Sequence, residues 1–210
     1  MAVIEYFYSA HSAYAYLGSA RFMAIASATG RSVVHKPIDL DEVVPASGSA
    51  SFKQKSDAYR AYYFDREIKR WSEHRNAPVQ GRPSYHHHDT TTVNCMLVAG
   101  VEQSLNMDQL AHALLEAHWR YDADLDDDAT LERVASAAGY DARALLEAAV
   151  TAPVRAAYAA NTREAIERNV LGSPTYVVDG DVFYGQDRLE MVERAIDHPY
   201  AMDWSGPQTD

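Results

Sequence analysis

Two short β-rich segments lie near opposite ends of this 210-residue chain, and each adjoins a distinctive loop. The first, residues 3–8 (VIEYFY), passes through residues 9–13 (SAHSA) into a segment whose apolar residues recur at helical spacing. The second, residues 176–178, follows a Gly-Ser-Pro-Thr motif at residues 172–175. Runs of β-branched and aromatic residues indicate strands, whereas a period of three to four indicates a helix. The chain is therefore predicted to begin strand, loop, helix and to return to the same sheet near its other end.

A second strand and a hairpin would complete this sheet. Residues 33–38 (VVHKPI) follow the first helix, and a strand-helix-strand unit implies parallel pairing through a right-handed crossover. Asp179-Gly180 separates residues 176–178 from another β-rich run at residues 182–184, which is a strong hairpin signal. A last helix is predicted to follow. This order, with a Ser-Pro pair ahead of a strand, is typical of a thioredoxin-like fold.

The middle of the chain is predicted to be helical. Residues 39–51 are expected to form a loop because they contain a proline and a Ser-Gly-Ser sequence. Residues 55–75 are predicted to be helical and residues 76–89 to form a second loop. Residues 90–168 contain no convincing strand and are punctuated by residues that cap helices.

These elements predict an α/β chain, a thioredoxin-like fold with a large all-helical insertion. The thioredoxin-like domain would consist of two halves, residues 1–52 and 169–210. The insertion would span residues 53–168. A chain of 210 residues is long enough for one such domain with its insertion.

The formal net charge of −11 argues against nucleic acid and against anionic membrane surfaces as partners. No stretch approaches the roughly 18 apolar residues that span a bilayer, and the first residues lack the basic segment of a signal peptide. Between Lys53 and Arg82, however, lie eight of the nineteen basic residues. Such a segment either focuses a small anion onto one face of the protein or is an ordinary solvated helix.

Cys95 is the only cysteine, so the chain forms no internal disulfide and is expected in a reducing, cytoplasmic compartment. It lies in an apolar helical stretch and is expected in the core rather than at a reactive site. A disulfide oxidoreductase is excluded by this count.

Ser12 stands where redox proteins of the thioredoxin fold carry the first cysteine of a Cys-x-x-Cys pair; here the stretch is Ser12-Ala13-Tyr14-Ala15. A hydroxyl at the start of a helix ordinarily caps backbone N–H groups. The same N–H groups and the helix dipole also stabilise an anion such as a thiolate. Ser12 would then donate a hydrogen bond to a thiolate that a ligand supplies. A Ser-His pair with His11 is a further alternative.

Ser173-Pro174 precedes the hairpin, and this placement favours a cis bond although X-Pro bonds are usually trans. A cis bond would turn the backbone N–H and C=O of Ser173 toward a cleft shared with Ser12, where an extended peptide pairs with them. Asp187 would cap the last helix or receive a ligand ammonium group. Gln186 would hydrogen-bond a neighbouring ligand carboxylate.

Two groups of residues imitate metal sites. Three consecutive histidines, residues 86–88, cannot converge on one ion from a single strand or helix. The acidic run at residues 122–128 resembles the start of an EF-hand, but Asp127 occupies the glycine position and Arg133 the final glutamate position. No metal is predicted.

Together these motifs resemble the glutathione-dependent 2-hydroxychromene-2-carboxylate isomerases, relatives of the kappa-class glutathione transferases with a DsbA-like thioredoxin fold. Residues 172–180 (GSPTYVVDG) and 183–189 (FYGQDRL) are similar to that family's Gly-x-Pro-Thr-Phe-x-Val-Asp-Gly and aromatic-Gly-x-Asp-Arg motifs. Residues 12–17 (SAYAYL) are similar to its Ser-Pro-x-Ser-Tyr-Leu. The resemblance covers nearly the whole chain.

The resemblance implies a glutathione site. Ser12 would donate to the glutathione sulfur, and the backbone at Ser173 and Pro174 would pair with the cysteinyl unit. Gln186 and Asp187 would hold the γ-glutamyl end.

Other positions depart from the family. Arg60 falls where the family tends to carry a lysine that reaches glutathione, and Ser49 where it tends to carry asparagine. Ala13 replaces a proline and His11 an apolar residue. Together with the histidines at residues 86–88, His11 suggests a rebuilt substrate side.

The implied activity is a reversible cis-trans isomerisation with glutathione as catalyst, in the catabolism of aromatic compounds. The substrate would be a small aromatic carboxylate, bound by Arg82 or Lys53, and the family implies a homodimer. A kappa-type glutathione transferase or peroxidase needs the same thiolate site. A non-catalytic thioredoxin-like binding module is the alternative from another class, and its failure to bind glutathione would distinguish it.

Overall fold

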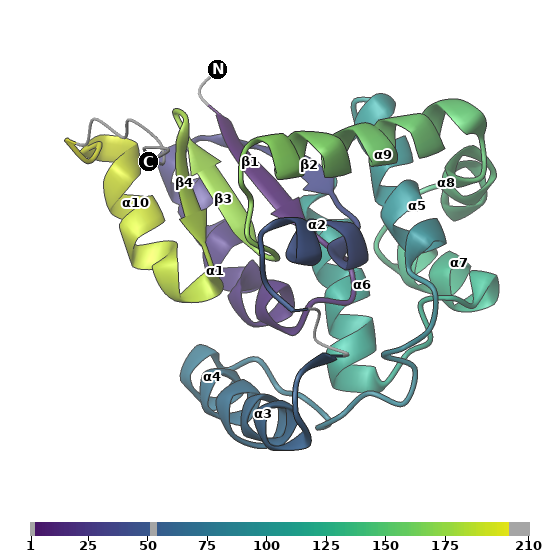
Figure 1. Cartoon of the computed structure of the whole chain (residues 1–210). Helices are drawn as coiled ribbons and strands as arrows, with labels where there is room; N and C mark the ends of the chain where they lie inside the picture. The colour runs from purple at the N-terminus through teal and green to yellow at the C-terminus, as the bar shows by residue number, and fades with distance from the viewer. Residues whose placement is uncertain (1–2, 51–53, 202–210) are drawn as a thin grey trace.

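The computed structural model describes residues 3–50 and 54–201 (Figure 1). Four strands form one mixed sheet in the order β2-β1-β3-β4. The strands are β1 (Val3–Tyr8), β2 (Ser32–Pro37), β3 (Thr175–Val178) and β4 (Asp181–Tyr184). β1 pairs in parallel with β2 and antiparallel with β3, and β3 pairs antiparallel with β4. The predicted thioredoxin-like sheet is confirmed.

The turn between β3 and β4 is the predicted Asp-Gly hairpin. Asp179 has φ 49° and Gly180 has φ 93°. Positive φ at both central residues matches the right-handed twist of the strands, and aspartate followed by glycine adopts it at low cost. The side chain of Asp179 also forms an ion pair at 2.9 Å with Arg31, which follows the first helix.

One face of the sheet is covered by α1 (Ala13–Thr29) and α10 (Leu189–Asp197) (Figure 1). Alternate residues of β1 point to this face. Tyr6 stacks on Tyr8 with ring centroids 4.1 Å apart and on Tyr176 at 5.4 Å. Phe22 of α1 packs against both Tyr6 and Tyr176. This layer is apolar and fully buried, and it fixes the position of α1 on the sheet.

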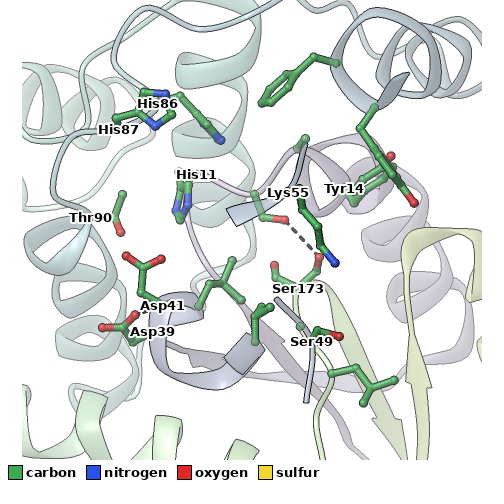
Figure 2. A pocket seen from close by; sticks show the side chains of 18 of the residues that line it. His11, Tyr14, Asp39, Asp41, Ser49, Lys55, His86, His87, Thr90 and Ser173 are labelled. Atoms are coloured by element: carbon green, nitrogen blue, oxygen red, sulfur yellow. Dashed lines mark hydrogen bonds between the residues drawn. The ribbon is translucent and has the colours of Figure 1, made fainter. Parts of the chain in front are cut away.

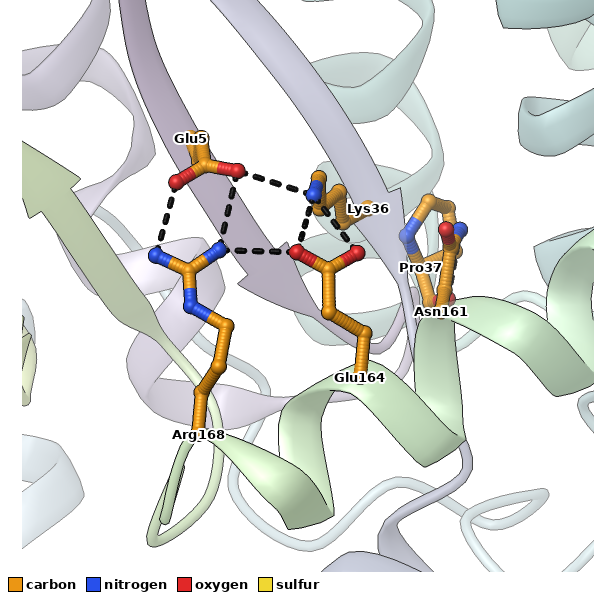
Figure 3. A network of polar contacts seen from close by, with 6 residues as sticks. All are labelled: Glu5, Lys36, Pro37, Asn161, Glu164 and Arg168. Atoms are coloured by element: carbon orange, nitrogen blue, oxygen red, sulfur yellow. Dashed lines mark hydrogen bonds and ion pairs between the residues drawn. The ribbon is translucent and has the colours of Figure 1, made fainter. Parts of the chain in front are cut away.

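The other face is covered by α2 (Leu40–Ala46) and α9 (Ala152–Glu167). On this face an ion-pair network joins β1 and β2 to α9 (Figure 3). Lys36 lies 2.8 Å from Glu5 and 2.5 Å from Glu164, and Arg168 contacts both carboxylates at 2.8 Å. The hydrogen bond from Arg168 lowers the pKa of Glu5 to about 2. These ion pairs therefore fix the C-terminal end of α9 against β1 and β2.

Residues 54–168 are built from helices. The first two of these helices, α3 (Asp57–Tyr62) and α4 (Ile68–Arg75), are joined without a break by a π-helical turn (Tyr63–Glu67). The following helices are α5 (Thr91–Glu102), α6 (Asp108–Tyr121), α7 (Asp128–Ala137), α8 (Ala142–Ala149) and α9. The prediction that residues 90–168 contain no strand is confirmed. The division at residue 168 stays a prediction, although α9 packs on the sheet.

One predicted loop is wrong. Residues 40–46 form α2, whose first turn is capped by the Asp39 carboxylate, an acceptor for the Asp41 N–H at 2.8 Å. Pro45 was expected to exclude a helix, but it lies in the last turn, where the missing N–H removes only one hydrogen bond. Val43 compensates because it is buried against the sheet.

A buried chain of polar groups connects the sheet to α6. The Tyr8 hydroxyl lies 3.0 Å from Nδ1 of His35, and Nε2 of His35 lies 2.8 Å from Asp108. Because a carboxylate only accepts, Nε2–H donates to Asp108 and Nδ1 accepts from Tyr8.

No helix in residues 3–50 and 54–201 has both the length and the apolar character of a bilayer span.

Candidate functional site

A cavity of about 630 Å³ opens where the N-terminus of α1 meets α2, the α3–α4 segment and the loop before β3. Its volume falls in the range of small-molecule sites. Figure 2 shows two ends. The serine end carries Tyr14, Ser49, Lys55 and Ser173, with Ser12 beside Ser173; the histidine end carries His11, His86, His87, Thr90, Asp39 and Asp41.

Ser12 lies at the base of the serine end. It is the N-cap of α1, and its Oγ accepts a hydrogen bond from the Ala15 N–H at 3.3 Å. The same hydroxyl donates to the Ser173 carbonyl at 3.3 Å. The capping role and the cavity position therefore coincide, because one hydroxyl both ends a helix and faces the loop before β3.

The Ser173-Pro174 bond is cis, as predicted. Ser173 lines the cavity, and its Oγ accepts from the Ser9 N–H at 3.2 Å, which ties the loop to the end of β1. The Pro174 carbonyl accepts from the Gly185 N–H at 2.9 Å and points away into the hairpin. The prediction that Ser12 and the Ser173 carbonyl share one cleft is confirmed.

Four tyrosines surround the serine end: Tyr14, Tyr59, Tyr63 and Tyr184. The ring centroid of Tyr63 lies 6.3 Å from that of Tyr14, in an edge-to-face arrangement, and 4.6 Å from that of Tyr59. Burial raises the pKa of Tyr14, and a hydrogen bond with Tyr63 raises that of Tyr59 to about 12. The hydroxyls of Tyr14 and Tyr59 therefore keep their protons at neutral pH and remain hydrogen-bond donors.

The basic side chain at the serine end is Lys55, which sequence reasoning did not single out for this role. Lys55 lines the cavity, and its ammonium group lies 5.1 Å from the centre of the Tyr59 ring. Arg60, the predicted residue, does not line it. Its guanidinium contacts Asp57 and donates to the Lys55 carbonyl at 2.5 Å. Arg60 thus holds the backbone of the residue that does line the cavity.

Gln186 and Asp187 lie outside the cavity lining. Gln186 is 1% exposed, and its side-chain and backbone oxygens accept from Arg75 at 2.9 and 3.1 Å. Asp187 is exposed beside Tyr184, with a contact of 3.6 Å to Arg188. Of the predicted glutathione residues, Ser12, Ser49 and Ser173 are thus brought together. The roles of Gln186 and Asp187 stay predictions.

Of the two basic residues proposed for the substrate carboxylate, Arg82 does not line the cavity. Arg82 pairs with Asp65 at 2.9 Å and lies over the ring of Phe64. Lys53 lies outside the described residues.

The histidine end is made by three segments that are far apart in the sequence. The rings of His11 and His86 lie 5.3 Å apart, and His86 contacts His118 of α6 through a 3.1 Å hydrogen bond. The ring centroids of Trp119 and His86 lie 5.2 Å apart, and the Trp119 indole N–H donates to the His11 carbonyl at 3.0 Å. Sequence spacing gave no signal for His118 or Trp119, because only the packing of α6 brings Trp119 to the cavity and His118 against His86.

Within residues 3–50 and 54–201, no group of three or more His, Cys, Asp or Glu side chains has an arrangement that would hold a metal ion. The three consecutive histidines have separate surroundings. His86 bonds to His118, whereas His88 contacts Asp124 at 3.0 Å. Cys95 is fully buried in α5, and burial raises the pKa of its thiol.

Comparisons with known proteins agree with this architecture. The sequence profile of the DSBA-like thioredoxin domain matches residues 3–197. A 2-hydroxychromene-2-carboxylate isomerase of Sphingobium xenophagum is 25% identical over 90% of this chain and 95% of its own length. The match to these isomerases confirms the resemblance drawn from the motifs.

Two solved structures share the fold. The structure of a 2-hydroxychromene-2-carboxylate isomerase superposes with a TM-score of 0.80 at 22% identity, over 93% of this chain and 94% of the other. The cytosolic disulfide reductase DsbM of Pseudomonas aeruginosa, determined with GSH, superposes with a TM-score of 0.64 at 15% identity, over 94% and 93%.

Proposed function

The chain belongs to the family of DSBA-like thioredoxin domains, and we propose that it is a glutathione-dependent isomerase of the 2-hydroxychromene-2-carboxylate type. The substrate class comes from the names of its relatives, which match over nine-tenths of the chain. The dependence on glutathione is argued from the residues of the serine end.

The contact between the Ser12 hydroxyl and the Ser173 carbonyl carries the proposal. A cysteinyl unit offers one backbone N–H donor and, as a thiolate, one strong acceptor. The pair offers the complement, an O–H donor and a C=O acceptor, which now bond to each other at 3.3 Å. A bound cysteinyl N–H would take over the carbonyl and release the hydroxyl toward the sulfur.

The position of Ser12 at the N-terminus of α1 adds a second reason. The first N–H groups of a helix have no partner within it, and the helix dipole is positive at this end. Both lower the pKa of a thiol placed there. The chain's one cysteine is buried in α5, so a thiolate at Ser12 has to come from a ligand.

Lys55 and the tyrosines suit the remaining groups of the tripeptide. Lys55 supplies a cation for a ligand carboxylate, and Ser49 adds a hydroxyl to the same wall. Asp187 is exposed beside Tyr184 and would receive the γ-glutamyl ammonium group. Gln186 fixes this turn by its hydrogen bonds with Arg75, and its contact with a ligand carboxylate stays a prediction. One structural relative was determined with GSH, at a lower similarity.

When bound, glutathione supplies a thiolate that adds reversibly to the carbon–carbon double bond of the substrate after its pyran ring has opened to a phenol and a ketone, so that this bond can rotate before the thiolate leaves again. The chain's own residues create the conditions for this chemistry. Ser12 and the start of α1 keep the thiol ionised, and the cavity walls orient the substrate beside it. Tyr14 retains its proton because of burial and can donate to a developing enolate oxygen. A homodimer and a cytoplasmic location stay predictions from the sequence.

The proposal is tested by measuring isomerisation of 2-hydroxychromene-2-carboxylate by purified protein with and without glutathione. We expect turnover only when glutathione is present, and binding of glutathione at sub-millimolar affinity by calorimetry. S-methylglutathione, which cannot form a thiolate, is the matched control and should bind without supporting turnover. Turnover at the full rate in the absence of glutathione would refute glutathione dependence, and absence of binding would favour a non-catalytic module.

A further inference from the structure

A chain of hydrogen bonds fixes the proton positions of two histidines behind the cavity. Nδ1 of His118 lies 3.0 Å from the Ala123 carbonyl, which only accepts, so Nδ1 carries the proton. In a neutral imidazole Nε2 of His118 is then an acceptor. It lies 3.1 Å from Nδ1 of His86, which therefore donates to it. By the same rule, Nε2 of His86 is left with a lone pair and no proton.

This lone pair is open to the cavity. Among the described residues, none forms a hydrogen bond with Nε2 of His86, and the only fully buried polar side-chain atoms without a partner are the hydroxyls of Tyr6 and Tyr176. His86 itself lines the cavity. Its acceptor nitrogen is thus unpartnered among the described residues, on a ring that a ligand in the cavity can contact.

Aromatic side chains hold the His86 ring in place. His118 lies edge to edge with it through their hydrogen bond, with ring centroids 5.4 Å apart, and Trp119 and Phe64 contact it edge to face at 5.2 and 5.7 Å. His11 lies on a further side at 5.3 Å. A flat apolar group that enters here meets aromatic walls and one fixed acceptor.

Electrostatics favour a neutral donor over an anion at this end. Burial, followed by the neighbouring histidines, lowers the pKa of His86 to about 3, and burial lowers that of His118. Both rings are therefore uncharged at neutral pH. Asp39 and Asp41 face the same end (Figure 2) and repel a carboxylate, whereas Lys55 lies at the serine end.

We propose that Nε2 of His86 accepts a hydrogen bond from the phenolic hydroxyl of the ring-opened substrate, and that His118 is the positioning residue that fixes this acceptor. The aromatic substrate rests on the proposed function, but the acceptor does not. Because His11 adjoins Ser12 in the chain, the hydroxyl is held near the thiolate site. The substrate then lies with its hydroxyl at the histidine end and its carboxylate toward Lys55.

The test is calorimetric binding of 2-hydroxycinnamate and of cinnamate, which differ by one hydroxyl. One neutral hydrogen bond makes the hydroxylated ligand bind about 3- to 10-fold more tightly to the unmodified protein. In His86→Phe this preference falls to about one, while cinnamate binding is retained. His74→Phe makes the same change at an exposed histidine of α4 that does not line the cavity, and it keeps the preference. Equal affinities for the two ligands in the unmodified protein, or a preference that survives in His86→Phe, would overturn the proposal.

A second measurement is made on the unmodified protein, so it does not depend on whether a variant folds. Long-range proton–nitrogen NMR spectra of the unmodified protein distinguish the two neutral tautomers of histidine. We expect both His86 and His118 to carry the proton on Nδ1, and the Nε2 resonance of His86 to shift when 2-hydroxycinnamate binds. His118→Gln keeps an acceptor for His86 Nδ1 and preserves this signature; His118→Phe removes it. A proton on Nε2 of His86 would refute the assignment.

These outcomes separate the two proposals. Neither measurement uses glutathione or turnover. A His86-dependent preference in a protein that does not bind glutathione would leave the hydroxyl site standing and refute the proposed isomerase. Glutathione-dependent isomerisation without that preference would support the proposed isomerase and refute the hydroxyl site.

Discussion

The two ends of the cavity hold their polar groups in different ways. At the serine end, Ser12 caps α1 and contacts the Ser173 carbonyl, so each group belongs to a backbone motif that its neighbours in the sequence create. At the histidine end, His86 owes its tautomer to His118, a residue of α6 that lies 32 positions away. The first end is assembled from loop motifs, and the second from the packing of helices.

This difference separates chemistry from recognition. The serine end combines a helix N-terminus, a hydroxyl and a cation, which suit an anionic sulfur and a carboxylate. The histidine end offers aromatic walls and one neutral acceptor, which suit an uncharged ring with a hydroxyl. A variant at the serine end should therefore affect the thiol and the rate, whereas a variant at the histidine end should affect ligand preference.

The largest expected effect is at Ser12. Ser12→Ala removes one charge-assisted hydrogen bond to the thiolate, worth about 1.5–3 kcal/mol, and should lower the rate about ten- to a hundredfold. It should also raise the pKa of the bound thiol, measured by ultraviolet titration of the thiolate. Asp141→Ala, which removes the cap of α8 far from the cavity, controls for a loss of stability. Identical thiol pKa values in Ser12→Ala and the unmodified protein would reduce Ser12 to a helix cap.

A smaller effect separates Lys55 from Arg60. Lys55→Met should weaken glutathione binding about 3- to 10-fold, because Lys55 lines the cavity and its cation would pair with a ligand carboxylate in the proposed complex. Arg60→Met should weaken it by less than about twofold, since the Arg60 guanidinium is already engaged with Asp57 and the Lys55 carbonyl. Calorimetry on both variants measures the comparison. The opposite order would return the role to Arg60, the residue that sequence reasoning favoured.

The smallest effect concerns stability at the histidine end. The pKa of His86 is about 3 in the folded protein, against an ordinary histidine value of 6.5, so the unfolded chain binds more protons as pH falls from 6.5 toward 3. Stability from a neutral His86 is complete above pH 6.5 and is lost on acidification. Between pH 7 and 5.5 the loss should be about 1 kcal/mol, or roughly 2–4 °C in Tm.

His86→Phe should show a shallower decline, measured by thermal unfolding at both pH values. Part of the decline should remain, because burial also lowers the pKa of His118. His74→Phe, at an exposed histidine of α4, is the matched control and should follow the unmodified protein. Parallel curves for all three proteins would show that His86 does not titrate abnormally.

Local patterns predicted much of the fold. The hairpin at Asp179-Gly180 and the first and last strands were predicted from adjacent residues, because turn type and strand propensity are set over a few positions. The helix over residues 40–46 was missed because Pro45 outweighed the capping signal of Asp39. Its stability comes partly from Val43, whose burial depends on the sheet beneath it.

By itself, the sequence determined the thioredoxin-like order of strands, the hydroxyl in place of a thiol at Ser12, and the cis bond before Pro174. Each of these depends on short-range geometry. Only the tertiary structure decided that Lys55 rather than Arg60 lines the cavity, and that His118 fixes the tautomer of His86. Those relations depend on how helices distant in the chain pack together, and the packing is set by buried surfaces rather than by sequence spacing.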